Sequence, residues 1–130
     1  MTHYLKAAMQ EQQNHEINVI YQAGQPQATW TPRPQGTDRI QANVNDTISF
    51  VFDGPETLTN AVMMSGPRKK GEDGSPFDGG NQINIVPGTP YTIDKNAGLW
   101  GFSIAFTTVN ADGVSNFYFL PDPELEVGST

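Results

Sequence analysis

The sequence of 130 residues contains no cysteine. This absence excludes disulfide bonds, thiolate nucleophiles, zinc–thiolate sites and blue-copper sites, and it favours a reducing compartment. Histidine is nearly as scarce, because His3 and His15 are the only two. Their separation does not match the roughly three or four residues that place two metal ligands on one helical turn. The sequence therefore predicts no metal site, no cofactor and no histidine-based catalysis.

Positive charge is also scarce. The chain has 7 lysines and arginines against 14 aspartates and glutamates, which gives a net charge of −7. The basic run Arg68-Lys69-Lys70 is nearly cancelled by Glu72 and Asp73. Nucleic acids and anionic membranes are bound by clustered lysines and arginines, so we expect neither as the main partner.

Long apolar runs are missing as well. No stretch approaches the roughly 20 apolar residues that span a bilayer. Residues 1–6 show no signal-peptide pattern. We therefore expect a cytoplasmic protein that does not enter a membrane.

Turn residues and aromatic residues are plentiful, with 13 glycines, 10 prolines and 10% aromatic residues. In residues 99–109 a period of two places Trp100, Phe102 and Phe106 on one face, which is typical of a strand. Further strands are expected at 17–21, 40–44, 48–52, 58–63, 83–86, 91–93 and 114–120. The pattern predicts an all-β chain that forms one antiparallel β-sandwich domain over residues 1–130. We expect about seven or eight strands in an immunoglobulin-like or cupredoxin-like topology.

The turn Asn45-Asp46 separates residues 40–44 from residues 48–52, and this arrangement predicts a β-hairpin. Residues 45–50 are similar to the turn and following strand of cupredoxins. A cupredoxin copper site needs a cysteine and two histidines, whereas this chain has no cysteine and no histidine after His15. The resemblance therefore implies a similar fold without the copper site.

Three segments are not expected to be regular strands. Residues 1–15 have apolar side chains at helical spacing and predict a short helix or a loose arm. Residues 24–36 are rich in proline and glycine and predict a loop. The prolines of residues 121–130 argue against a regular ladder, so this tail is expected to fray or to pack along a neighbouring strand or subunit.

Two strands suggest an interface. The second face of residues 99–109 carries small side chains, which permit close approach by another sheet or subunit. Residues 114–120 are apolar on both faces, as in central or interface strands. Phe117 and Phe119 lie on one of these faces. The interface residues that we predict are Tyr118, Leu120, Asp122, Pro123 and Glu124.

The run from Phe117 to Gly128 resembles the C-terminal signature of a bacterial family named DP-EP. Asp122, Pro123 and Glu124 match that signature, while Leu125 stands where proline is expected. The family has no assigned activity, so the resemblance implies a bacterial source and adds no mechanism.

A ligand site is the alternative. Trp30, in the proline-rich segment, could stack on a sugar ring, and Arg68, Asp73 and Asp78 lie in the long polar stretch 65–81. This stretch offers oxygen ligands for Ca²⁺, although it does not match the spacing of an EF-hand.

Three functions follow from these patterns. The leading hypothesis is a non-enzymatic binding or assembly protein that forms homo-oligomers. The second is a module that binds carbohydrate or Ca²⁺ through Trp30 and residues 65–81. The third is a hydrolase that uses two facing carboxylates. A serine hydrolase is disfavoured, because the sequence lacks a G-x-S-x-G motif and an available histidine.

Overall fold

The structure is a computed structural model that describes residues 12–31, 39–68, 74–94, 97–121 and 123–128. Within these ranges the chain forms strands and turns without a helix, which confirms the prediction of an all-β chain. The strands are β1 (Asn14–Gln22), β2 (Gln25–Thr31), β3 (Arg39–Asn43), β4 (Thr47–Asp53), β5 (Thr57–Pro67), β6 (Gln82–Asn84), β7 (Tyr91–Thr92), β8 (Gly98–Val109), β9 (Ser115–Leu120) and β10 (Glu124–Gly128). The predicted helix or arm of residues 1–15 lies outside the described residues except at its end, where β1 begins.

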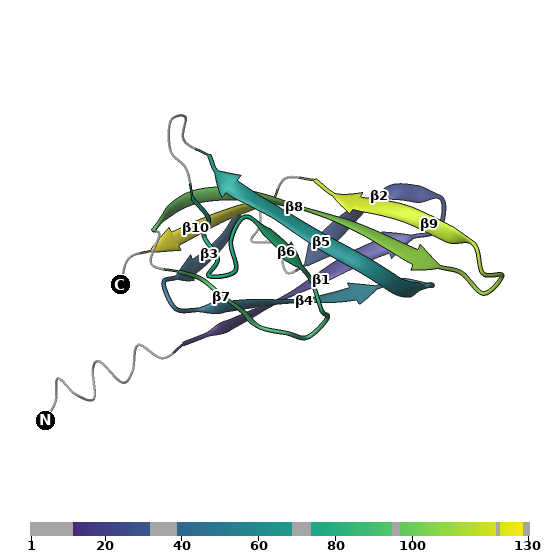
Figure 1. Ribbon diagram of the computed structural model, residues 1–130, viewed down its shortest axis with the longest axis horizontal. Helices are drawn as coiled ribbons and strands as arrows, with labels where there is room; N and C mark the ends of the chain where they lie inside the picture. The colour runs from purple at the N-terminus through teal and green to yellow at the C-terminus, as the bar shows by residue number, and fades with distance from the viewer. Residues whose placement is uncertain (1–11, 32–38, 69–73, 95–96, 122, 129–130) are drawn as a thin grey trace, which may run out of the picture.

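The strands form one 10-stranded sheet whose main path runs β3-β10-β8-β9-β2-β1-β4-β7, with β5 and β6 attached beside β8 (Figure 1). Most neighbours are antiparallel, but β1 pairs with β4, β10 with β3, and β2 with β9 in parallel. The sheet is therefore mixed, and the prediction of a purely antiparallel arrangement is wrong. Strand β2 also corrects the predicted loop of residues 24–36 over its first half; residues 32–36 lie outside the described residues.

The predicted hairpin of residues 40–44 and 48–52 does not form, although both segments are strands. Strand β3 pairs with β10, while β4 pairs with β1 and β7. The turn between them bends at Asn45, whose φ of 77° lies in the left-handed region that asparagine tolerates well. It carries the chain from one end of the sheet path towards the other, so that β3 and β4 lie in different parts of the sheet.

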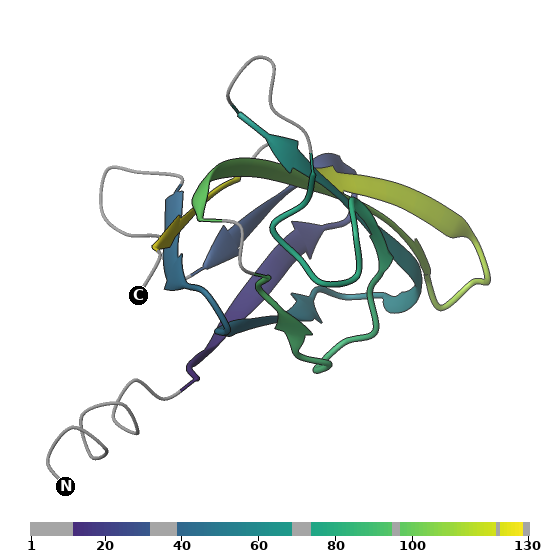
Figure 2. The same ribbon diagram turned by 60° about the vertical axis from the view of Figure 1, so that its left-hand side comes forward.

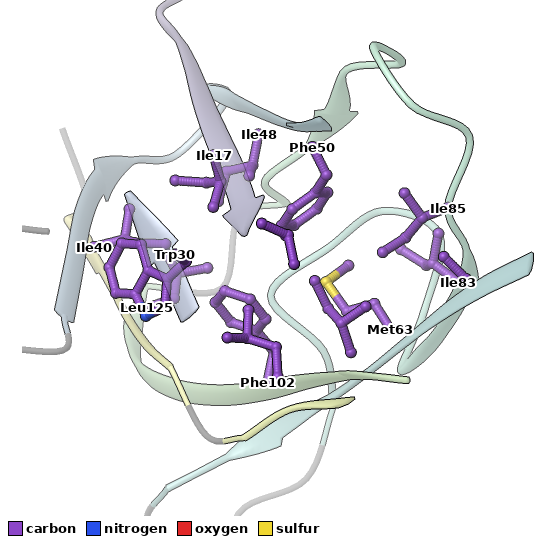
Figure 3. Packing of buried hydrophobic residues seen from close by; sticks show 14 of the residues in the cluster. Ile17, Trp30, Ile40, Ile48, Phe50, Met63, Ile83, Ile85, Phe102 and Leu125 are labelled. Atoms are coloured by element: carbon purple, nitrogen blue, oxygen red, sulfur yellow. The ribbon is translucent and has the colours of Figure 1, made fainter. Parts of the chain in front are cut away.

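The sheet curves around a single cluster of buried hydrophobic side chains (Figures 2 and 3). Ring pairs join β4 to β8 across this core: the centroids of Phe50 and Phe102 are 6.1 Å apart, and those of Phe52 and Phe106 are 5.0 Å apart. Trp100, Phe102 and Phe106 are all buried, as the alternation in residues 99–109 predicts. The long strand β8 is therefore the centre of the core.

The described part of the predicted tail, residues 121 and 123–128, contains a strand. Its residues Glu124–Gly128 form β10, which lies between β3 and β8. Leu125 and Val127 point into the core and are buried. Both prolines precede the strand, a position that the ladder tolerates because no donor is needed there. The expectation that the tail packs along a neighbouring strand is correct, and that neighbour belongs to the same chain.

Candidate functional site

Strand β9 turns Tyr118 and Leu120 towards the core. Tyr118 is 2% exposed and Leu120 is 1% exposed, so the prediction that these two residues form an interface is wrong. The ring of Tyr118 stacks on Phe106 with a centroid separation of 5.3 Å. Phe117 and Phe119 point the other way and remain 61% and 38% exposed. The apolar surface left open by β9 is therefore on the outer face of the sheet.

The strands around these phenylalanines carry no charge. Strands β6, β5, β8 and β9 are neighbours in this order, and none of their residues is aspartate, glutamate, lysine or arginine. Phe119 lies beside Ala105 on β8, and Ala105 lies beside Val62 on β5. Phe117 lies beside Thr107. The side chain of Arg68 lies against Gly101 at one end of this face, so the uncharged part of the face extends from Ser103 towards Phe117.

The same face combines large and small side chains. Met64, which is 50% exposed, lies beside Ser103, so protruding apolar groups stand on both sides of the small residues of β8. Protein–protein contacts are typically depleted of charge at their centre and enriched in aromatic residues and methionine. The outer face, defined by Val62, Met64, Ser103, Ala105, Thr107, Phe117 and Phe119, therefore has the properties of a docking surface.

Glu56 fixes the orientation of β9. Its carboxylate accepts hydrogen bonds from the Thr108 hydroxyl at 2.6 Å, the Tyr118 hydroxyl at 2.8 Å and the Asn116 amide at 3.0 Å. These bonds, with that of Thr108 the largest effect, hold the pKa of Glu56 below its ordinary value. The Tyr21 hydroxyl donates to the Glu56 carbonyl at 2.6 Å. The bend before β5 is thus bonded to β1, β8 and β9, and Phe117 and Phe119 are left outside.

A polar cavity of about 420 Å³ lies where β1, β3 and β10 come together. Its lining includes the side chains of Gln13, His15, Gln41, Asn43 and Glu126. His15 follows the inward phase of β1, which places its ring beside the turn between β3 and β4. The sequence-based expectation that His15 belongs to a helix or a loose arm is therefore wrong.

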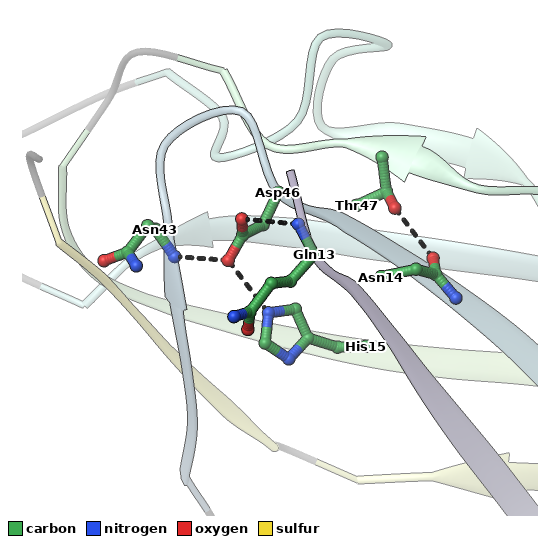
Figure 4. Close-up of polar contacts among 6 residues, drawn as sticks. All are labelled: Gln13, Asn14, His15, Asn43, Asp46 and Thr47. Atoms are coloured by element: carbon green, nitrogen blue, oxygen red, sulfur yellow. Dashed lines mark hydrogen bonds and ion pairs between the residues drawn. The ribbon is translucent and has the colours of Figure 1, made fainter. Parts of the chain in front are cut away.

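Asp46 organises the wall of this cavity (Figure 4). One carboxylate oxygen accepts from the backbone N–H of Gln13 at 3.0 Å, and the other accepts from the backbone N–H of Asn43 at 2.9 Å and lies 2.9 Å from His15 Nε2. Burial on its own raises the pKa of Asp46, but these hydrogen bonds together outweigh it, and the pKa lies below its ordinary value. The side chain joins β1 to the turn, and both of its oxygens are occupied by partners within the chain.

Comparison with protein-family models, with curated proteins and with solved structures finds no match. The function therefore has to be inferred from the geometry of the outer face and of the cavity.

Neither a cluster of metal ligands nor a membrane-spanning helix is found in the described part of the chain. There, no group of three or more histidine, cysteine, aspartate or glutamate side chains is placed to hold a metal ion. The same ranges contain no helix of the length and apolarity needed to cross a membrane.

Trp30 is not the surface platform that its surroundings in the sequence predicted. It lies in β2 opposite Val19 and is 3% exposed. It belongs to the same buried cluster as Ile40 and Leu125 (Figure 3). A ring enclosed in this way cannot stack on a sugar, so the carbohydrate site predicted at Trp30 is wrong.

The polar stretch 65–81 is not one loop. Its first residues, up to Pro67, belong to β5, and residues 69–73, including the predicted ligand residue Asp73, lie outside the described residues. Arg68 pairs with Glu124 of β10, with Nε 3.6 Å from Oε2. Asp78 is exposed, and its backbone N–H donates to Thr92 at 3.0 Å. The structure places Arg68 and Asp78 in separate contacts.

The three tail residues that were predicted to form an interface differ in their position in the structure. Asp122 lies outside the described residues. Pro123 is buried, and its carbonyl accepts from the Phe102 backbone N–H at 3.0 Å. Glu124 is the first residue of β10 and meets Arg39 at 3.4 Å. The contacts of Pro123 and Glu124 are made within the chain.

Proposed function

We propose that the protein is a non-enzymatic binding or assembly protein that self-associates through the outer face of β5, β8 and β9. The observation that carries this proposal is the exposure of Phe117 and Phe119 on β9. This strand is one of four adjacent strands that contain no charged residue. Leaving such side chains in water is unfavourable, and burying one phenylalanine stabilises a complex by about 1.5–3 kcal/mol.

A second copy of the chain fits this surface by its shape. In a two-fold contact the same patch meets itself, so large side chains on one copy must pack over small side chains on the other. The outer face has both within a few residues, because Phe117 and Phe119 stand beside Ala105 and Thr107. The absence of charge also matters, since a chain with a net charge of −7 repels its own copies wherever acidic residues meet.

The finer description of the fold and setting is part of the same proposal. Rings on β1 and β4 pack against rings on β8 and β9, which supports a β-sandwich of immunoglobulin-like or cupredoxin-like type. The net negative charge supports a protein that has neither nucleic acid nor an anionic membrane as its main partner, and the lack of cysteine supports a cytoplasmic setting.

The proposal is tested by light scattering over a concentration series. The wild-type chain is expected to form dimers as its concentration rises. The double variant Phe117→Ser/Phe119→Ser should weaken dimerisation at least about tenfold, because a loss of about 1.4 kcal/mol already has that effect. Val86→Ser is the matched control, since Val86 is 60% exposed but lies outside the outer face. A wild-type chain that stays monomeric throughout, or a control that weakens the dimer equally, would overturn the proposal.

The polar cavity supports a second candidate, a binding site for a neutral polyhydroxylated ligand such as a sugar. The amide side chains of Gln13, Gln41 and Asn43 both donate and accept hydrogen bonds, as hydroxyl groups require. Titration of a glycan panel, followed by NMR, should shift the amide signals of β3 and β10, and Gln41→Ala should abolish the shifts. Signals unmoved by every glycan would remove this candidate.

The hydrolase is the weakest of the three hypotheses. Asp46 and Glu126 both line the cavity, but Asp46 accepts hydrogen bonds on both oxygens and its pKa is lowered. A general acid needs a raised pKa instead. Asp46 is therefore unsuited to the role of general acid, one of the two roles that glycoside hydrolysis requires.

A further inference from the structure

Strand β10 lies between β3 and β8, and it is the only strand in the described part of the chain that pairs with β3. On one side it pairs in parallel with β3, from Glu124 opposite Arg39 to Gly128 opposite Asn43. On the other side it pairs antiparallel with β8, where Leu125 faces Trp100. Both long edges of β10 are therefore bonded, as in a central strand.

The neighbours of β10 match its side chains in charge as well as in shape. Glu124 meets Arg39 at 3.4 Å and Arg68 at 3.6 Å. Glu126 accepts from the Gln41 amide at 3.2 Å. Between these carboxylates Leu125 enters the core. The slot between β3 and β8 thus fits an extended segment in which acidic and apolar side chains alternate, and most other segments of the chain lack this pattern.

Strand β10 follows β9 after a short connection. Strands β9 and β10 lie one after the other along the same edge of β8, where β9 pairs with residues 104–109 and β10 with residues 98–101. The three residues 121–123 join them, and the chain has no disulfide to hold β10 in place. Removal of β10 leaves β3 without a strand partner among the described residues and exposes the edge of β8 at residues 98–101, while the pairings among the remaining strands stay in place.

We propose that β10 of one copy occupies the slot between β3 and β8 of a second copy, so that chains assemble by strand exchange. Every contact of β10 is preserved in the exchanged form, because the slot of the second copy is identical. Only the path of residues 121–123 and the protein concentration distinguish the closed monomer from the exchanged assembly. The proposal deepens the self-association proposed above but uses β10, not Phe117 or Phe119.

The absence of cysteine makes a clean test possible. Gln41 and Glu126 face each other in the parallel ladder and are joined by a side-chain hydrogen bond, so cysteines at these two positions lie within disulfide range. Full-length Gln41→Cys chains and Glu126→Cys chains are unfolded together in urea, refolded as a mixture at high concentration, and oxidised. A disulfide-linked heterodimer is expected only where β10 of one chain occupies the slot of the other.

Two controls make each outcome decisive. The double variant Gln41→Cys/Glu126→Cys at low concentration should form the bond within one chain, which shows that the pair is competent and the chain folded. A mixture of Asp112→Cys with Glu126→Cys reports random collision, because exposed Asp112 follows β8 at the end opposite to residues 98–101, with which β10 pairs. A heterodimer in the first mixture alone supports strand exchange. Equal yields in both mixtures, or no heterodimer where the double variant crosslinks internally, overturns it.

The result is separate from the test of the outer face. Failure of the heterodimer together with loss of dimers in Phe117→Ser/Phe119→Ser would leave self-association through the face standing. A heterodimer that persists in chains carrying both serine substitutions would show exchange without the face.

Discussion

Replacing Leu125 by alanine tests whether β10 belongs to the core. Leu125 is 0% exposed, and its neighbours Ile40 on β3 and Trp100 on β8 are buried as well. Truncation of a buried leucine lowers the free energy of unfolding by about 2–5 kcal/mol, because apolar burial is lost and a cavity remains. Since Leu125 has neighbours on both sides and no access to water, we expect a loss in the upper part of that range, about 3–5 kcal/mol.

The assay is equilibrium unfolding in urea, followed by the fluorescence of the two tryptophans. For a urea dependence of about 1–3 kcal/mol per molar, a loss of 3 kcal/mol lowers the midpoint by about 1–3 M. Glu126→Ala is the matched control on the same strand, because its side chain is 46% exposed, and it should change the free energy of unfolding by less than about 1 kcal/mol. A change below about 0.5 kcal/mol for Leu125→Ala would refute the assignment of β10 to the core.

Four further variants test the packing and the polar contacts. The pKa of Asp46 is lowered in the folded chain, so its ionised form stabilises the fold above the ordinary value of 3.8, and this contribution is lost as the pH falls through the lower folded value. Asp46→Asn should therefore flatten the fall in unfolding free energy between about pH 5 and pH 2, and an unchanged slope would contradict the argument. Gly54→Ala should cost about 1–3 kcal/mol in urea unfolding, because the added Cβ would overlap the Tyr21 ring, whereas Gly66→Ala, which meets open space, should not. Trp30→Ala should lower the free energy of unfolding by about 3–5 kcal/mol, and a loss below about 1 kcal/mol would contradict the burial of Trp30 in the core.

The alternation of side chains predicted the strands well, because it reflects the two-residue period of the extended backbone itself. Residues 99–109 form β8 with the predicted face inward. The same pattern says nothing about which strand lies alongside. Residues 40–44 and 48–52 are strands separated by a turn, yet the turn of Asn45 leads to a different part of the sheet because Asp46 bonds to the start of β1.

The tail shows how a correct local rule can be given too much weight. Proline does interrupt a ladder, but Pro121 and Pro123 stand before the strand and not within it. The alternation of Glu124, Leu125, Glu126 and Val127 was present in the sequence and was the signal that could have found β10. Its two partners, by contrast, lie far away along the chain and could not be identified from local pattern.

The candidate docking face was only half predictable. Alternation in residues 114–120 separates Phe117 and Phe119 from Tyr118 and Leu120, but both sets are apolar, so the pattern does not decide which set faces inward. That choice depends on Glu56, whose carboxylate accepts a hydrogen bond from the hydroxyl of Tyr118, 62 residues later in the chain. A tyrosine needs a partner for its hydroxyl when it is buried, and phenylalanine does not, which is the one signal that could have favoured the correct face.

The pairing of β3 with β10 also means that the sheet can be completed only late in the synthesis of the chain. Paired residues of these strands are 85 positions apart, so a ribosome that adds about 5–20 residues per second makes β10 about 4–17 seconds after β3. During that interval β3 has no neighbour from its final ladder, and its backbone can bond to strands of other chains. Sheets closed by such distant segments fold slowly, in milliseconds to seconds. Nascent chains of this protein should therefore depend on chaperones until β10 is in place.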